Sequence, residues 1–208
     1  MQHPRLPRLA ATLILIVAAS SCSKTTTWSD IAQSDDGSTV MVEQSVRHTF
    51  TGGELSQAFT RWPSYYKIRA TNPRSGKTVK WKGTFGLVPI LIGFTPQKTY
   101  LVAFANRCNA KIDSFSINGF PYIFQETDDG KVWKTVSPSA FPTRLRRANL
   151  SSDWRGDGKM QRPADIARTN RAMEFSTNMH YSRDIPRSFK EWKYAHKNEP
   201  LCSGGSVH

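Results

Sequence analysis

The sequence predicts a mainly β protein: an antiparallel sandwich or small barrel of about seven strands, with a basic C-terminal extension of loop and helix. Three observations lead to this fold class. Short stretches rich in β-branched and aromatic residues recur between residues 39 and 137, and Gly, Pro, Asn and Asp separate them. Beyond residue 137 the pattern becomes basic and irregular. The 208-residue chain has 11 Phe, six Tyr and six Trp, which supply a core although only 38% of residues are hydrophobic.

The expected strands follow one another closely through the β domain, residues 39–137. They span residues 39–50, 64–70, 77–83, 87–94, 99–105, 114–117, 122–126 and 131–136, the sixth and seventh being weak. The third of them alternates, so Val79 and Trp81 should face the core while Lys80 and Lys82 face water. Pro89 interrupts an apolar run and predicts an edge strand, a bulge or a strand start.

Residues 138–208 form the basic C-terminal extension. Between residues 144 and 197, Lys and Arg outnumber Asp and Glu by 13 to 6. Residues 163–175, with Pro at the first position, and residues 186–198 are expected to be helical. The extension has few apolar residues, so we expect it to pack on the β domain and not to fold alone.

The N-terminal segment indicates export. Arg5 and Arg8 precede an apolar run at residues 9–19, and small residues follow it. This organisation is typical of a secretory signal, residues 1–21, and the run is shorter than the about 20 residues that cross a bilayer as a helix.

The end of this signal, Ala19-Ser20-Ser21-Cys22, resembles the lipobox of bacterial lipoproteins, in which Leu usually stands where Ala19 does. The body resembles uncharacterised bacterial lipoproteins. The resemblance implies that Cys22 is diacylglycerated, that cleavage precedes it and that its new amino group is acylated. Ser23, where an Asp favours inner-membrane retention, implies sorting to the outer membrane, facing the periplasm. Residues 22–38 are polar and predict a lipidated tether. Ordinary secretion, with Cys22 incidental, is the alternative.

Two cysteines remain if Cys22 is acylated. Cys108 and Cys202 form an even pair in an oxidising compartment, which predicts a disulfide. The alternative is two separately buried thiols.

The charge predicts an anionic partner. The formal net charge is +13, and removal of residues 1–21, which contain two Arg and no acid, leaves +11. Export favours an anionic envelope polymer or a protein partner over nucleic acid. The candidate polyanion contacts are Lys80, Lys82, Arg144, Arg146 and Arg147.

The sequence contains no catalytic constellation. The histidines lack metal-ligand spacing, no Ser lies in a Gly-x-Ser-x-Gly motif, and no cofactor or metal is expected. We therefore expect a lipid-anchored, non-catalytic envelope protein. Two alternatives stay open: a hydrolase of envelope glycan or lipid whose site is assembled from dispersed residues, and a subunit of a secretion or surface complex.

Overall fold

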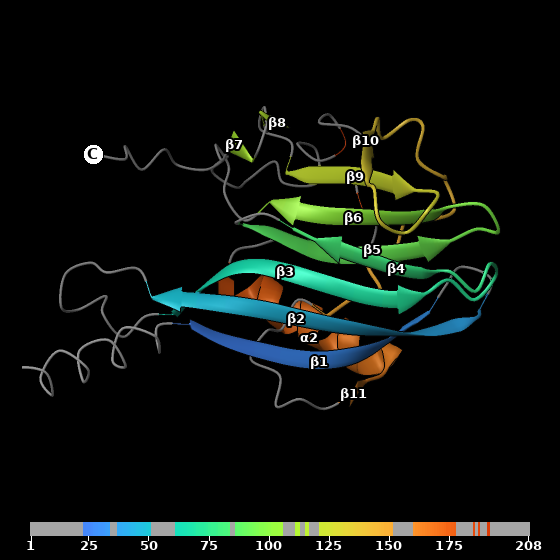
Figure 1. Ribbon diagram of the computed structural model, residues 1–208. Helices are drawn as coiled ribbons and strands as arrows, with labels where there is room; N and C mark the ends of the chain where they lie inside the picture. Colours follow the sequence, from blue (N-terminus) through green and yellow to red (C-terminus); the bar gives the residue numbers. More distant parts are fainter. Residues whose placement is uncertain are drawn as a thin grey trace, which may run out of the picture.

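The computed structural model describes residues 23–33, 37–50, 61–83, 86–105, 111–112, 115–116, 121–151 and 160–177, with residues 185, 187 and 191. In this part of the chain the protein is mainly β, with sheets that are mostly antiparallel, which confirms the predicted fold class (Figure 1). The elements are β1 (Ser23–Gln33), β2 (Thr39–Phe50), β3 (Arg61–Thr71), β4 (Thr78–Lys82), β5 (Leu87–Phe94), β6 (Thr99–Ala105), β7 (Lys111–Ile112), β8 (Phe115–Ser116), β9 (Tyr122–Thr127), β10 (Lys134–Val136), β11 (Met160–Gln161) and α2 (Pro163–Thr177).

Two sheets contain most of the strands. The large sheet has five strands in the order β11-β1-β2-β3-β4, and the small sheet has four in the order β10-β9-β6-β5. The β1–β11 pair is parallel, and the other pairs of these two sheets are antiparallel. Neighbouring strands are mostly consecutive in the chain, as in a meander, because short turns suffice to connect antiparallel strands.

The prediction of a tether over residues 22–38 is wrong for residues 23–33, which form β1. This strand pairs with β2 over its whole length, from Ser23 opposite Thr49 to Gln33 opposite Thr39. Its inward positions include Trp28, which is 2% exposed. The Trp28 ring meets the Tyr66 ring edge-on at 6.4 Å between centroids. Burial of this large side chain against β3 stabilises a strand whose other residues are mainly small and polar.

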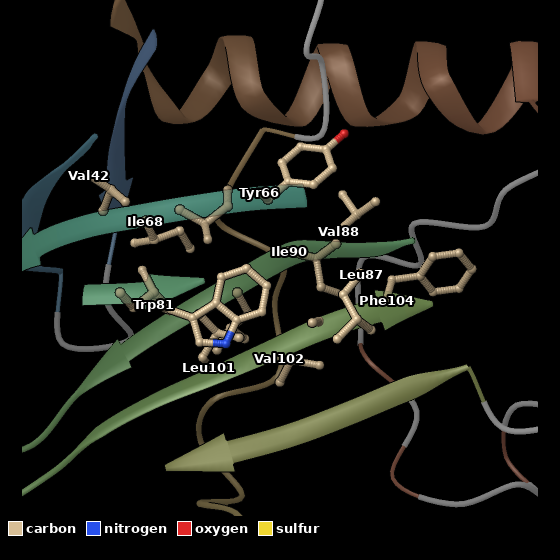
Figure 2. Packing of buried hydrophobic residues seen from close by; sticks show 14 of the residues in the cluster. Val42, Tyr66, Ile68, Trp81, Leu87, Val88, Ile90, Leu101, Val102 and Phe104 are labelled. Carbon is tan, nitrogen blue, oxygen red and sulfur yellow. The ribbon is translucent and has the colours of Figure 1, made fainter. Parts of the chain in front are cut away.

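The core lies between the two sheets and also includes Phe141, Leu145, Leu150 and Ile185. Figure 2 shows Ile68 and Trp81 of the large sheet in one cluster with Leu101 of the small sheet. Trp81 also donates from Nε1 to Gln125 Oε1 at 2.8 Å, which joins the sheets through a polar contact. Within β4, Val79 and Trp81 are buried while Thr78, Lys80 and Lys82 are exposed, as the alternation predicts.

The edge strand β5 carries the irregularity that its proline predicts. It ends the small sheet, and its register with β6 shifts between Pro89 and Leu91. Asn149 covers this edge: its Oδ1 accepts from Ile92 N at 2.9 Å and its Nδ2 donates to Ile92 O at 2.8 Å. The same Nδ2 donates to Gln33 O at 3.1 Å, which connects the end of β1 to the edge. An otherwise open strand edge is thereby closed.

Residues 138–151 pack against the small sheet. Phe141 meets the Phe124 ring at 5.0 Å and the Tyr100 ring at 5.3 Å. Leu145 lies over Gly93, where a Cβ would stand only 2.5 Å from the Leu145 Cδ1 atom. This segment therefore adds apolar side chains to the same core as the two sheets.

The helix predicted at residues 163–175 is present as α2, Pro163–Thr177, with proline at its first position. It lies behind β1 and β2 in Figure 1. Ile166 is 2% exposed, and Asn170 Nδ2 donates to Leu150 O at 3.0 Å. The second expected helix, at residues 186–198, lies almost wholly outside the described residues. No helix in the described part of the chain combines the length and the apolar character that crossing a bilayer requires.

Candidate anion-binding face

The outer face of the large sheet carries a dense group of cations. Side chains alternate along each strand, so the residues between the buried ones of β2, β3 and β4 share this face. A pocket of about 600 Å³ lies on it. We call the five cations that line this pocket the basic face: Lys67, Arg69, Lys80, Lys82 and Lys131.

Strand register sets four of these cations in two like-charged pairs. Lys67 stands directly opposite Lys82, and Arg69 directly opposite Lys80, on neighbouring strands. Opposed residues have Cβ atoms about 5 Å apart, and the next row along the strands lies about 7 Å away. Like charges at this spacing destabilise a sheet, so the arrangement costs stability when nothing anionic is bound.

Only part of this repulsion is offset within the described residues. Arg69 Nη1 lies 3.9 Å from Glu43 Oε2, between two exposed side chains, and such a pair contributes about 0–1 kcal/mol. Lys82 Nζ lies 4.6 Å from the centre of the Tyr65 ring, and Lys67 Nζ lies 5.6 Å from it. These contacts with the negative face of the ring are weak at exposed positions.

The cations around Tyr65 also affect the pKa of its hydroxyl. Arg47 Nη1 donates to the Tyr65 hydroxyl at 3.3 Å. This hydrogen bond, with the charges of Arg47, Lys67 and Lys82, lowers the pKa of Tyr65 below its usual value. The positive potential therefore extends from the basic face to the next row of the sheet.

A turn between β9 and β10 forms one wall of the pocket. Lys80 N donates to Gly130 O at 2.8 Å, and Trp133 Nε1 donates to Lys80 O at 2.8 Å. Both backbone groups of Lys80 are thus bound by the turn, which closes the edge of β4. Gly130 has φ +76°, and a Cβ there would lie 2.5 Å from Thr78 O, so only glycine allows this close approach.

The turn is held in shape by Asp129. Its Oδ1 accepts from Lys131 N and Val132 N, each at 2.8 Å, and from Thr127 Oγ1 at 2.9 Å. The two backbone hydrogen bonds, followed by the Thr127 hydroxyl, lower the pKa of Asp129 to about 2. The carboxylate stays ionised over the whole physiological range, and the half-buried Trp133 is fixed beside the cations.

The structure separates the candidate contacts into two groups. Lys80 and Lys82 lie in the basic face. Arg144, Arg146 and Arg147 are exposed on the segment that packs against the small sheet, and none of them lines that pocket. Arg147 lines a second pocket, of about 500 Å³.

Three members of the basic face were missed from the sequence: Lys67, Arg69 and Lys131. The alternation of residues 64–70 puts the first two on the face of the strand away from Tyr66 and Ile68. Only the strand register places them beside Lys82 and Lys80.

A buried polar cluster lies on the inner side of the large sheet. Asp30 is 0% exposed, and its Oδ2 accepts from Ser151 N at 2.7 Å and from Gln44 Nε2. Burial raises the pKa of Asp30 to about 6; the Ser151 and Gln44 hydrogen bonds and the nearby Trp28 indole oppose this shift. The cluster joins β1 and β2 to residues 138–151.

Several expectations fall on residues outside those described, including Cys22, Cys108 and Cys202. His48, a described histidine, is buried and 3% exposed. Among the described residues, no group of three or more His, Cys, Asp or Glu could hold a metal ion. Within the described lining of the 600 Å³ pocket, Glu43 is the one carboxylate.

Comparison of the chain with protein-family models, curated proteins and solved structures gives no match. The functional argument therefore depends on the sequence and on the geometry of the site.

Proposed function

We propose that this protein is a lipid-anchored, non-catalytic protein of the cell envelope, held in the outer membrane and facing the periplasm, that binds an anionic envelope component with its basic face. One observation supports the binding role above all others. Two like-charged cross-strand pairs, Lys67 with Lys82 and Arg69 with Lys80, adjoin in a hollow on an exposed sheet.

An anionic ligand offsets the repulsion that this arrangement creates. Four cations whose Cβ atoms lie about 5–8 Å apart raise one another's free energy, and a bound anion compensates because it attracts all four. The net charge of +11 after removal of residues 1–21 adds long-range attraction. Lysines scattered over the surface would give the same net charge, whereas here five cations line one pocket together with Trp133.

The anchor places the β domain close to the membrane. Cys22, the proposed acylation site, directly precedes β1 in the sequence. One extended residue spans about 3.3 Å, so the sheet begins almost at the lipid-bearing residue. Several acyl chains on one residue give stable anchoring.

The anchor is tested by mass spectrometry of the mature N-terminus. We expect a chain that begins at Cys22 and carries a diacylglyceryl group and a third acyl chain. A free thiol on Cys22, or an uncleaved leader, would remove the anchor from the proposal. Titration of thiols in denatured, unreduced protein tests the compartment: a Cys108–Cys202 disulfide leaves none free, and two reactive thiols would contradict it.

The binding role is tested with two charge-matched double variants of the full chain. One carries Lys67→Gln and Lys82→Gln, and the other carries Arg144→Gln and Arg146→Gln. Both lose two positive charges, but only the first changes the basic face. The ligand is an envelope extract immobilised on beads, and binding is measured between about 50 and 300 mM salt, where screening weakens exposed charge interactions.

We expect the Lys67/Lys82 variant to lose about tenfold in affinity, because two exposed contacts to anions contribute about 1.4 kcal/mol together. The Arg144/Arg146 variant should stay within about twofold of the wild type. Equal losses in both variants would show that net charge, and not this face, determines binding. An affinity that stays the same over this range of salt concentration would refute the electrostatic role altogether.

A further inference from the structure

We infer that the ligand of the basic face is an acidic saccharide: a sugar chain whose anionic groups alternate with free hydroxyl groups. The inference rests on the proposed function, since it names the chemical class of ligand for the same face. It is drawn from the residues that share the pocket with the cations.

Glu43 is the first of these residues. It is exposed, lines the same pocket and stands opposite Arg69 in the strand register. An ionised carboxylate only accepts hydrogen bonds and repels other anions. Towards phosphate or carboxylate alone, Glu43 adds repulsion, and its exposed pair with Arg69 is too weak to make it useful there. A sugar hydroxyl, in contrast, needs an acceptor, and a charged acceptor gives a stronger hydrogen bond than a neutral one.

Hydroxyl side chains complete the row next to Glu43. Thr27 lies opposite Ser45, and Ser45 lies opposite Lys67, and all three line the pocket. Each hydroxyl both donates and accepts, as sugar hydroxyls do. The pocket therefore offers cations, a charged acceptor and hydroxyl groups over two neighbouring rows of the sheet.

Trp133 supplies a rigid apolar wall at the edge of these rows. Its indole is tethered to Lys80 O, and the turn that carries it is fixed by Asp129. An aromatic ring held in place before binding loses little conformational entropy when a ligand packs on it. A sugar ring presents C–H groups for such packing beside its hydroxyls, whereas inorganic phosphate chains have none.

A bilayer surface is the competing anionic partner. Among the described residues, the exposed large apolar side chains near the face are Met41 and Met160 on the sheet and Val132 on the turn. Proteins that bind a bilayer surface insert apolar side chains below the headgroups. Met41, Met160 and Val132 do not line the pocket, and from β1 to β4 the two central rows of the outer face consist of hydroxyl and charged residues. These are Thr27, Ser29, Glu43, Ser45, Lys67, Arg69, Lys80 and Lys82.

Glu43→Gln gives a test whose sign separates the ligand classes. The full chain and the variant are titrated by calorimetry with oligogalacturonate, a carboxylated sugar chain, and with inorganic polyphosphate, at one salt concentration. We expect the variant to bind oligogalacturonate about fivefold more weakly, because a charged acceptor for hydroxyl groups is lost. It should bind polyphosphate about twofold more tightly, because one repulsive charge is removed.

A second variant tests the wall. Trp133→Leu should bind oligogalacturonate about tenfold more weakly and polyphosphate within twofold of the wild type, since the cations remain. A thermal melt of each variant confirms that the protein is folded at the titration temperature. If Trp133→Leu is unfolded there, the Glu43→Gln result alone decides.

The outcomes distinguish this inference from the proposed function. If Glu43→Gln tightens binding of both ligands, or if phosphatidylglycerol vesicles or an oligonucleotide bind more tightly than oligogalacturonate, the ligand is not a saccharide, although the face still binds anions. If the Lys67→Gln/Lys82→Gln variant binds every anionic probe as the wild type does, the proposed function fails as well.

Discussion

The buried carboxyl of Asp30 makes the stability of the protein depend on pH in a direction opposite to that of most acids. Asp30 is 0% exposed, and burial raises the pKa of its carboxyl from 3.8 to about 6. Between these two values the folded protein holds a proton that the unfolded chain has released. Stability then falls as pH rises, because the folded state binds more protons than the unfolded state does.

The size of the effect follows from the two pKa values. A difference from 3.8 to about 6, at about 1.4 kcal/mol per pH unit, corresponds to about 3 kcal/mol in all. Most of it, about 2.5 kcal/mol, is lost between pH 4 and pH 7.5. Asp30→Asn has nearly the same shape and does not titrate, so it lacks this contribution.

The assay is urea unfolding of the wild type and of Asp30→Asn at several pH values from 4 to 7.5. The difference between their free energies of unfolding should change by about 2.5 kcal/mol across this range, with the wild type relatively more stable at the acid end. Other titrating groups are common to both proteins and cancel in the difference. A difference that stays constant within about 0.5 kcal/mol, or that favours the wild type at the alkaline end, would refute the reasoning.

Three further changes test how the core and the turn are built. Gly130→Ala should destabilise the protein by at least about 2 kcal/mol in urea unfolding, because the new Cβ clashes with Thr78 O and the backbone has a positive φ. Gly37→Ala, also at positive φ but with open space around it, should cost about 1 kcal/mol. Equal costs for the two variants would contradict the clash. Gly93→Ala should lower the free energy of unfolding by about 1–3 kcal/mol, because the new methyl group overpacks against Leu145. In a double-mutant cycle with Leu145→Ala, the double variant should lose less than the sum of the two single losses. Strictly additive losses would exclude the contact. Trp81→Phe should cost about 1–3 kcal/mol, because the hydrogen bond between the two sheets is lost, and an unchanged urea midpoint would show that the bond contributes nothing.

Part of the basic face follows from local sequence, and part depends on register. Alternation along β4 places Lys80 and Lys82 outward because Val79 and Trp81 between them are apolar. The same reasoning orients Lys67 and Arg69 within β3. The pairing of β3 with β4 decides which cation of one strand stands opposite which cation of the other, and local sequence specifies such pairing only weakly.

The sequence by itself determined the fold class, the orientation of β4, the irregular edge at Pro89 and the start of α2 at Pro163, because each depends on properties of neighbouring residues. Tertiary structure alone decided that residues 23–33 form a strand. Their small polar side chains allow a strand or a tether, and the buried position of Trp28 against Tyr66 selects the strand. The meeting of Asp30 with Ser151, 121 residues apart in the chain, likewise required the folded protein, since no local pattern records a contact between such distant segments.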